Sequence, residues 1–230
     1  MYGFRLPEDF LIGTSSSAFQ SEGAWDKDGK SPSMMDHYAR LFAGKPAPNV
    51  IAHEEGSKKP AQRPPMTEEL PDRGCFFYDH YEEYIEDMAK TGQNVFRMSL
   101  AWPRIIPTGV GAVNPKAIDF YNKVIDKLLE KGITPFVDLY HWDLPQCLED
   151  LGGFTNEQFP EWFEAYAKVC FEAFGDRVKL WSTFNELSII VTGGYANGRF
   201  PPFRYDIKEG LLAGQLSSWL TTGLCGCISP

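Results

Sequence analysis

The chain has 230 residues, of which 43% are hydrophobic and 23% are charged, a composition typical of one soluble globular domain with a buried core. Its net charge of −9 argues against a nucleic-acid partner, because such proteins carry basic patches. No apolar run reaches membrane-spanning length, and residues 1–10 lack the apolar stretch of a signal peptide, so we expect a cytoplasmic protein.

The cysteine pattern indicates free thiols. The chain has five cysteines, an odd number, scattered at positions 75, 147, 170, 225 and 227. The pair Cys225-Gly-Cys227 has no second pair of ligands nearby, as a structural zinc site would need. We therefore expect no disulfide framework, no metal and no cofactor.

The first half of the chain begins with an expected strand at residues 10–16. Residues 43–73, rich in Pro, Lys and Glu, then predict a long loop. The residues that follow the loop repeat with helical periodicity, since Tyr81, Ile85 and Met88 fall on one helix face. Gly92 is placed to end this helix with a left-handed cap.

Residues 95–101 predict a second strand, again apolar and short. Asn114 followed by Pro115 then supplies a helix N-cap and a proline at the first helical position. The apolar face of that helix continues as far as Gly132.

A third strand is expected at residues 133–140 and a fourth at 178–184. Thr155 and Gln158 have the spacing of a capping box for the helix between them, which Gly175 would end. Strands that alternate with helices in this way predict parallel βα units, found in both doubly wound sheets and TIM barrels. No Gly-rich phosphate motif follows the first strand, which argues against a nucleotide-binding sheet.

Polar and aromatic residues gather where the expected strands end. They are Gln20 and Glu22 after the first strand, Arg97 and Trp102 within and after the second, His141, Trp142 and Asp143 after the third, and Asn185 and Glu186 after the fourth. The carboxyl ends of TIM-barrel strands form the active-site face. A lone His or Asn is usually a structural polar group, but four successive strand ends with such residues favour a site.

Five motifs carry a family resemblance. They read LPEDFLIG and SAFQSEGA at residues 6–13 and 17–24, FRMSLAWPRI at 96–105, LYHWDLPQ at 139–146 and TFNE at 183–186. In these motifs the chain resembles glycoside hydrolase family 1 over residues 6–214. The resemblance implies a (β/α)₈ barrel, of which this chain holds about the first four βα units. It also implies a retaining enzyme that hydrolyses β-glucosides or 6-phospho-β-glucosides.

The same resemblance implies roles for individual residues. Glu186 would be the general acid/base, and Gln20, His141 and Asn185 would hydrogen-bond the hydroxyls of the sugar. Trp142 would line the sugar site, and Arg97 would hold the nucleophile's carboxylate ionised. A retaining glycosidase needs one protonated carboxyl and a second carboxylate about 5 Å away, so burial of Glu186 and a raised pKa are expected.

Two features depart from the family pattern. Leu187 follows the acid/base glutamate where the family usually has proline, and the nucleophile motif Thr-Glu-Asn-Gly does not occur in the 230 residues. Asp143 and Glu22 could replace the nucleophile by position, but we expect neither to do so.

The chain is expected to comprise a half barrel at residues 1–214 and a divergent tail at 215–230. A shifted reading frame or an incomplete gene explains such a tail better than a natural terminus. Open sheet edges predict a homo-oligomer, unless the tail covers the opening. The alternative function is that of an inactive half-barrel fragment that binds a sugar or another ligand.

Overall fold

The computed structural model describes residues 5–42 and 74–223, with side chains up to residue 218. Its described strands are β1 (Gly13–Ser15), β2 (Val95–Ser99), β3 (Thr134–Tyr140) and β4 (Leu180–Phe184). They form one parallel sheet in the order β1-β2-β3-β4. The four expected strands and the parallel half-barrel topology are confirmed, whereas the expected loop at residues 43–73 lies outside the described residues.

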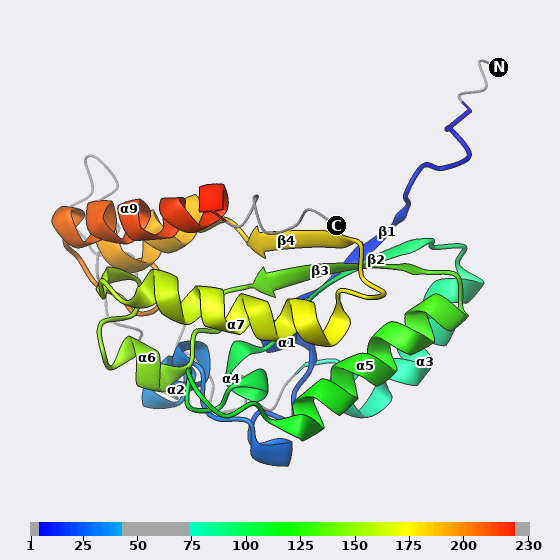
Figure 1. The fold of residues 1–230 in the computed structure, drawn as a ribbon, viewed down its shortest axis with the longest axis horizontal. Coiled ribbons are helices and arrows are strands. Elements are labelled where there is room, and N and C mark those ends of the chain that lie inside the picture. The colour runs from blue at the N-terminus through cyan, green and yellow to red at the C-terminus, as the bar shows by residue number, and fades with distance from the viewer. Residues whose placement is uncertain (1–4, 43–73, 224–230) are drawn as a thin grey trace.

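The helices that link these strands cover one face of the sheet. Figure 1 shows α3 (Phe77–Lys90), α5 (Pro115–Glu130) and α7 (Phe159–Phe174) side by side beneath the strands. Alternate strand residues, such as Phe96 and Val137, are fully buried against them. Their neighbours Val95 and Phe136 are only half-buried, because no described element covers the opposite face.

The remaining described elements lie mainly between the strands and these three helices. They are α1 (Ala18–Ser21), η1 (Lys27–Gly29), α2 (Met34–Leu41), α4 (Trp102–Ile105), α6 (Gln146–Glu149), η2 (Gly153–Thr155), α8 (Leu187–Ile189), η3 (Ile190–Ala196) and α9 (Ile207–Gly223). None of the described helices is long and apolar enough to cross a membrane.

The caps of the long helices confirm some expectations and correct one. The Asn114 side chain accepts a hydrogen bond from the Lys116 amide at 3.1 Å, and Gly92 adopts the left-handed φ of 77° after α3. The expected capping box of Thr155 and Gln158 is wrong. Thr155 instead lies in η2, where its hydroxyl donates to the Gly152 carbonyl at 2.8 Å, and α7 starts only at Phe159.

Much of the aromatic content fills the core. Trp102 stacks on Tyr166 with ring centroids 4.5 Å apart, and Phe163 stacks on Phe184 of β4 at 4.4 Å. Trp102, Tyr166 and Phe163 are completely buried. Trp102, which follows the second strand, is therefore a packing residue.

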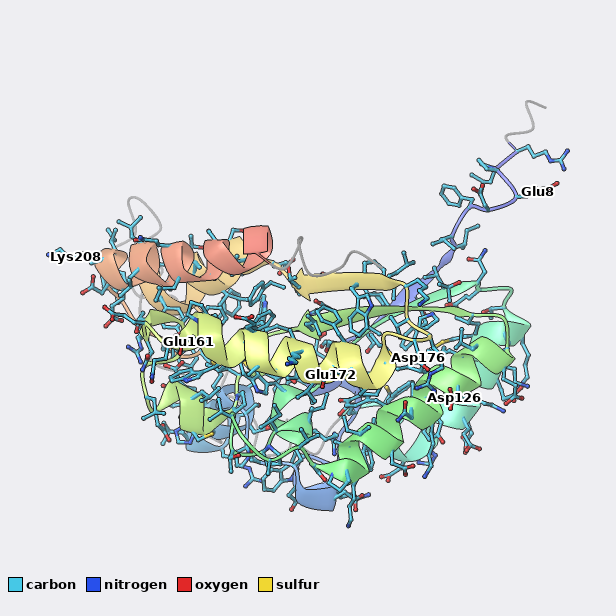
Figure 2. All side chains as sticks on the ribbon, in the orientation of Figure 1. Glu8, Asp126, Glu161, Glu172, Asp176 and Lys208 are labelled. Carbon is cyan, nitrogen blue, oxygen red and sulfur yellow. The ribbon has the colours of Figure 1, made fainter. Side chains whose placement is uncertain are left out.

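Ion pairs on the outer surface link the helices that cover the sheet. Arg177, in the connection between α7 and β4, pairs with Asp126 of α5 and donates to Asp176 at 3.1 Å. Figure 2 shows Asp126 and Asp176 close together at the ends of these helices. Glu161 and Glu172, labelled in the same figure, are exposed on α7.

Helix α9 runs from Ile207 to Gly223, across the boundary expected between residues 214 and 215. It packs on η2, η3 and α7. The division into half barrel and tail stays a prediction, because one helix can continue across such a junction.

Candidate active site

Arg97 connects all four strands at the carboxyl end of the sheet. It stands on β2 in register with Ser15 of β1 and Phe136 of β3. Its Nη2 donates to Asp138 Oδ2 at 2.5 Å and to Asn185 Oδ1, just after β4, at 3.0 Å. Its Nη1 lies 3.4 Å from the Ser15 hydroxyl. The guanidinium therefore ties Asn185 to the open face of the sheet.

His141 and Trp142 join the same network directly after β3. His141 Nδ1 lies 3.4 Å from Asp138 Oδ2, and its side chain is 16% exposed. The Trp142 indole donates to the Asn185 carbonyl at 3.1 Å. Trp142 has a φ of 76°, a conformation rare for a bulky residue and common at functional sites. Four of the expected site residues are thus brought together.

Glu186 follows Asn185 at the start of α8, with a left-handed φ of 50°. Its carbonyl accepts hydrogen bonds from the amides of Ile189 and Ile190, at 2.8 and 3.2 Å, which begin that helix. The side chain is exposed and has no hydrogen bond or ion pair to a described residue. The expected burial of Glu186 is therefore not observed, because the described chain leaves this face of the sheet open.

Gln20 belongs to α1, which is fixed to β2 by the hydrogen bond from the Ala18 amide to Ser99 Oγ at 2.8 Å. The Gln20 side chain is exposed and accepts a hydrogen bond from Ser17 Oγ at 2.8 Å. Within residues 5–42 and 74–223, no hydrogen bond joins Gln20 to His141 or Glu186. Its place in the sugar site stays a prediction.

Glu22 and Asp143, the two carboxylates that could have replaced the nucleophile, are buried outside the Arg97 network. Glu22 is buried and accepts hydrogen bonds from the Tyr121 hydroxyl at 2.7 Å and pairs with Arg104 at 3.0 Å. Asp143 is 2% exposed, and burial raises the pKa of its carboxyl well above the ordinary value. Glu22 is therefore engaged by Tyr121 and Arg104 inside the core, and Asp143 is also buried.

Sequence reasoning missed Asp138. Its side chain is only 1% exposed and contacts both Arg97 and His141. The available signal was a single charged residue inside the apolar run of β3, between Val137 and Leu139. An aspartate in the middle of a buried strand is rare unless it is paired.

Within the described ranges, no group of three or more His, Cys, Asp or Glu side chains could hold a metal ion. The chemistry offered by the described part of the site is that of one exposed carboxyl, one imidazole, one guanidinium and an amide. Such groups bind hydroxyl-rich ligands by hydrogen bonds and transfer protons.

Comparisons with known proteins agree with this arrangement. The model of the glycosyl hydrolase family 1 matches residues 3–215. The 6-phospho-beta-glucosidase GmuD of Bacillus subtilis is 41% identical, over 92% of this chain and 41% of that protein. The coniferin beta-glucosidase of Pinus contorta is 44% identical, over 98% of this chain and 39% of that protein.

Solved structures give the same result. The beta-glucosidase from Thermotoga maritima in complex with glucoimidazole superposes with a TM-score of 0.77 and 38% identity. That superposition covers 91% of this chain and 43% of the other. The chain therefore spans about two fifths of the length of its relatives. By motif, topology and match, the chain belongs to glycosyl hydrolase family 1.

Proposed function

We propose that this chain forms the N-terminal half of a retaining β-glycosidase site for β-glucosides or 6-phospho-β-glucosides. The observation that carries the proposal is the network of Arg97, Asn185, His141 and Trp142 at the carboxyl end of the sheet. One relative is a 6-phospho-beta-glucosidase and another is a coniferin beta-glucosidase, and both names support hydrolysis of a β-glucosidic bond. The two names do not decide whether the sugar carries a 6-phosphate.

In the proposed reaction, Glu186 donates a proton to the leaving glycosidic oxygen and later removes one from water. His141, Asn185 and Gln20 bind the sugar hydroxyls, and the indole of Trp142 packs against the ring. Arg97 supplies positive charge beside the second carboxylate. The family's nucleophile motif, Thr-Glu-Asn-Gly, does not occur in these 230 residues.

The 230 residues on their own should therefore hydrolyse β-glucosides very weakly. Acid catalysis alone contributes about 10²–10⁴-fold, and loss of a nucleophile costs several orders of magnitude. Release of nitrophenol from p-nitrophenyl β-glucoside and from its 6-phosphate measures this. Enzyme-like turnover that Glu186→Gln abolishes would show that a second carboxylate is present and would refute the prediction.

The exposure of Glu186 favours a second candidate, a half-barrel fragment that binds a sugar without cleaving it. An exposed carboxyl lacks the desolvation that a general acid near neutral pH requires. Under this alternative Glu186→Gln would leave the residual rate unchanged, while Trp142→Ala would weaken binding of a sugar measured by calorimetry. Loss of turnover in Glu186→Gln would favour the enzyme instead.

We also propose that the chain self-associates through its sheet edges. Within the described residues, β1 and β4 each have a neighbour on one side only, and the face with Val95 and Phe136 is partly open. A second copy related by a two-fold axis would pair these edges and cover that face. Light scattering at micromolar concentration tests this. A monomer that unfolds cooperatively would refute it.

A further inference from the structure

Asp138 lies at the centre of the site network, beneath the residues that would touch a sugar. Its carboxylate is 1% exposed and receives the Arg97 guanidinium at 2.5 Å through Oδ2. Its second oxygen, Oδ1, is buried and has no hydrogen-bond partner among the described residues. One acceptor is therefore spare at this position.

His141 presents the matching unsatisfied group. Its Nδ1 is also buried without a hydrogen bond from the described residues, and it lies 3.4 Å from Asp138 Oδ2. An ionised carboxylate can only accept hydrogen bonds, whereas an imidazole nitrogen donates only when it carries a proton. A small rotation of the carboxylate would satisfy both groups if the proton of His141 is on Nδ1.

We propose that Asp138 is a positioning residue of the sugar site, one that fixes His141 in the Nδ1–H tautomer while it holds Arg97 in place. The Nε2 nitrogen of His141 then carries a lone pair and accepts a hydrogen bond from a sugar hydroxyl. The hydrogen bond made by one ring nitrogen generally sets the role of the other. The identity of the ligand rests on the proposed function, but the tautomer is a property of the free chain.

A purely structural role makes a different prediction. If Asp138 served only as the counter-ion of Arg97, the His141 ring would have no reason to leave the Nε2–H tautomer that free histidine prefers. Asp138 and Arg97 would then stabilise the sheet and no more. The tautomer of His141 therefore separates the two roles.

The experiment uses the full chain with ¹⁵N-labelled histidine, at a pH high enough to leave every imidazole neutral. A long-range ¹H–¹⁵N spectrum reports which ring nitrogen is protonated. Of the four histidines, His141 is assigned by the signal that His141→Gln removes. We expect predominantly Nδ1–H at His141. Predominantly Nε2–H would overturn the proposal, and this measurement needs no variant at position 138.

Asp138→Asn provides the complementary test. Its amide oxygen would remain with Arg97 and its NH₂ would face His141, so the ring should switch to the Nε2–H tautomer. The matched control is Asp87→Asn, whose carboxylate is 71% exposed and paired with Lys90, and which should leave the His141 spectrum unchanged. A folded Asp138→Asn chain with an unchanged tautomer would overturn the proposal.

Calorimetric measurement of the binding of the iminosugar deoxynojirimycin tests whether the tautomer of His141 affects ligand binding. We expect Asp138→Asn to weaken this binding by at least about tenfold, by analogy with the loss of the hydrogen-bonded partner behind a metal-ligating histidine. If the wild-type chain does not bind deoxynojirimycin at all, the proposed function fails while the tautomer result stands. If Asp138→Asn binds as tightly as wild type although its tautomer has switched, the positioning role is overturned.

Discussion

Replacing Asp143 with asparagine should remove a loss of folding stability that develops as the pH rises. Asp143 is 2% exposed, and neither of its carboxylate oxygens has a hydrogen-bond partner among the described residues. Burial raises the pKa of this carboxyl well above its usual range, and the charge of Lys30 only partly opposes the effect. Lys30 itself is engaged by Asp36, at 2.6 Å.

The sign follows from proton binding. Because the pKa of Asp143 is higher in the folded chain, its contribution to stability is full below the unfolded pKa of about 3.9. That contribution is lost as the pH rises through the folded value. Between the unfolded and the folded pKa, the folded chain binds one proton more than the unfolded chain. The free energy of unfolding therefore falls by about 1.4 kcal/mol per pH unit as the pH rises. Asparagine has no such proton.

Urea unfolding, followed by tryptophan fluorescence at one protein concentration, measures the difference. At pH values between the unfolded and the folded pKa of Asp143, the wild type should lose stability relative to Asp143→Asn as the pH rises, by up to about 1.4 kcal/mol per pH unit. The exposed Asp26→Asn should follow the wild-type curve, because its carboxylate is open to solvent. Parallel curves for wild type and Asp143→Asn would refute the reasoning, since they would mean that Asp143 is ionised and satisfied in the folded chain.

Two further predictions concern the core. Tyr121→Phe removes the donor to Glu22 at 2.7 Å and the acceptor of the Ala101 amide at 2.8 Å, so urea unfolding should show a loss of about 1–3 kcal/mol. The exposed Tyr205→Phe should lose no more than about 0.5 kcal/mol, and equal losses would contradict the role of the hydroxyl. Gly153→Ala would place a Cβ 2.1 Å from Glu149 Oε2 at a φ of +54°, and should cost clearly more than Gly132→Ala, which has a φ of +70° and open space. Similar losses for the two glycine variants would show that the pocket around Glu149 adjusts freely.

The strands could be predicted because their signal is local. Residues 95–99 and 134–140 are short apolar runs between helices. They are apolar because residues such as Phe96 and Val137 are buried in the core, so the strands can be recognised from the sequence alone. The caps at Asn114 and Gly92 also follow from single residues whose conformational preferences are strong. These features depend little on distant contacts.

Other features depend on the geometry of a particular turn or on the pairing of strands, which a short motif does not show. The Thr155 and Gln158 pair has the right spacing for a cap, but Gly152, with a φ of 111°, turns the chain so that the Thr155 hydroxyl bonds backward. The capping box that does form joins Ser33 and Asp36 at the start of α2. The role of Asp138 appears only when β2 and β3 pair and bring Arg97 beside it.

The exposure of Glu186 and the pairing of Arg97 have a common cause. A retaining site requires a desolvated acid and a second carboxylate beside the arginine. In the described chain the open face of the sheet leaves Glu186 in solvent, and the buried Asp138 takes up the charge of Arg97. His141, Asn185 and Trp142 are nevertheless already connected, since their hydrogen bonds and close contacts involve only residues of this half. His141, Asn185 and Trp142 are therefore organised by the described residues alone, whereas the proton transfer that we propose for Glu186 would depend on covering the open face.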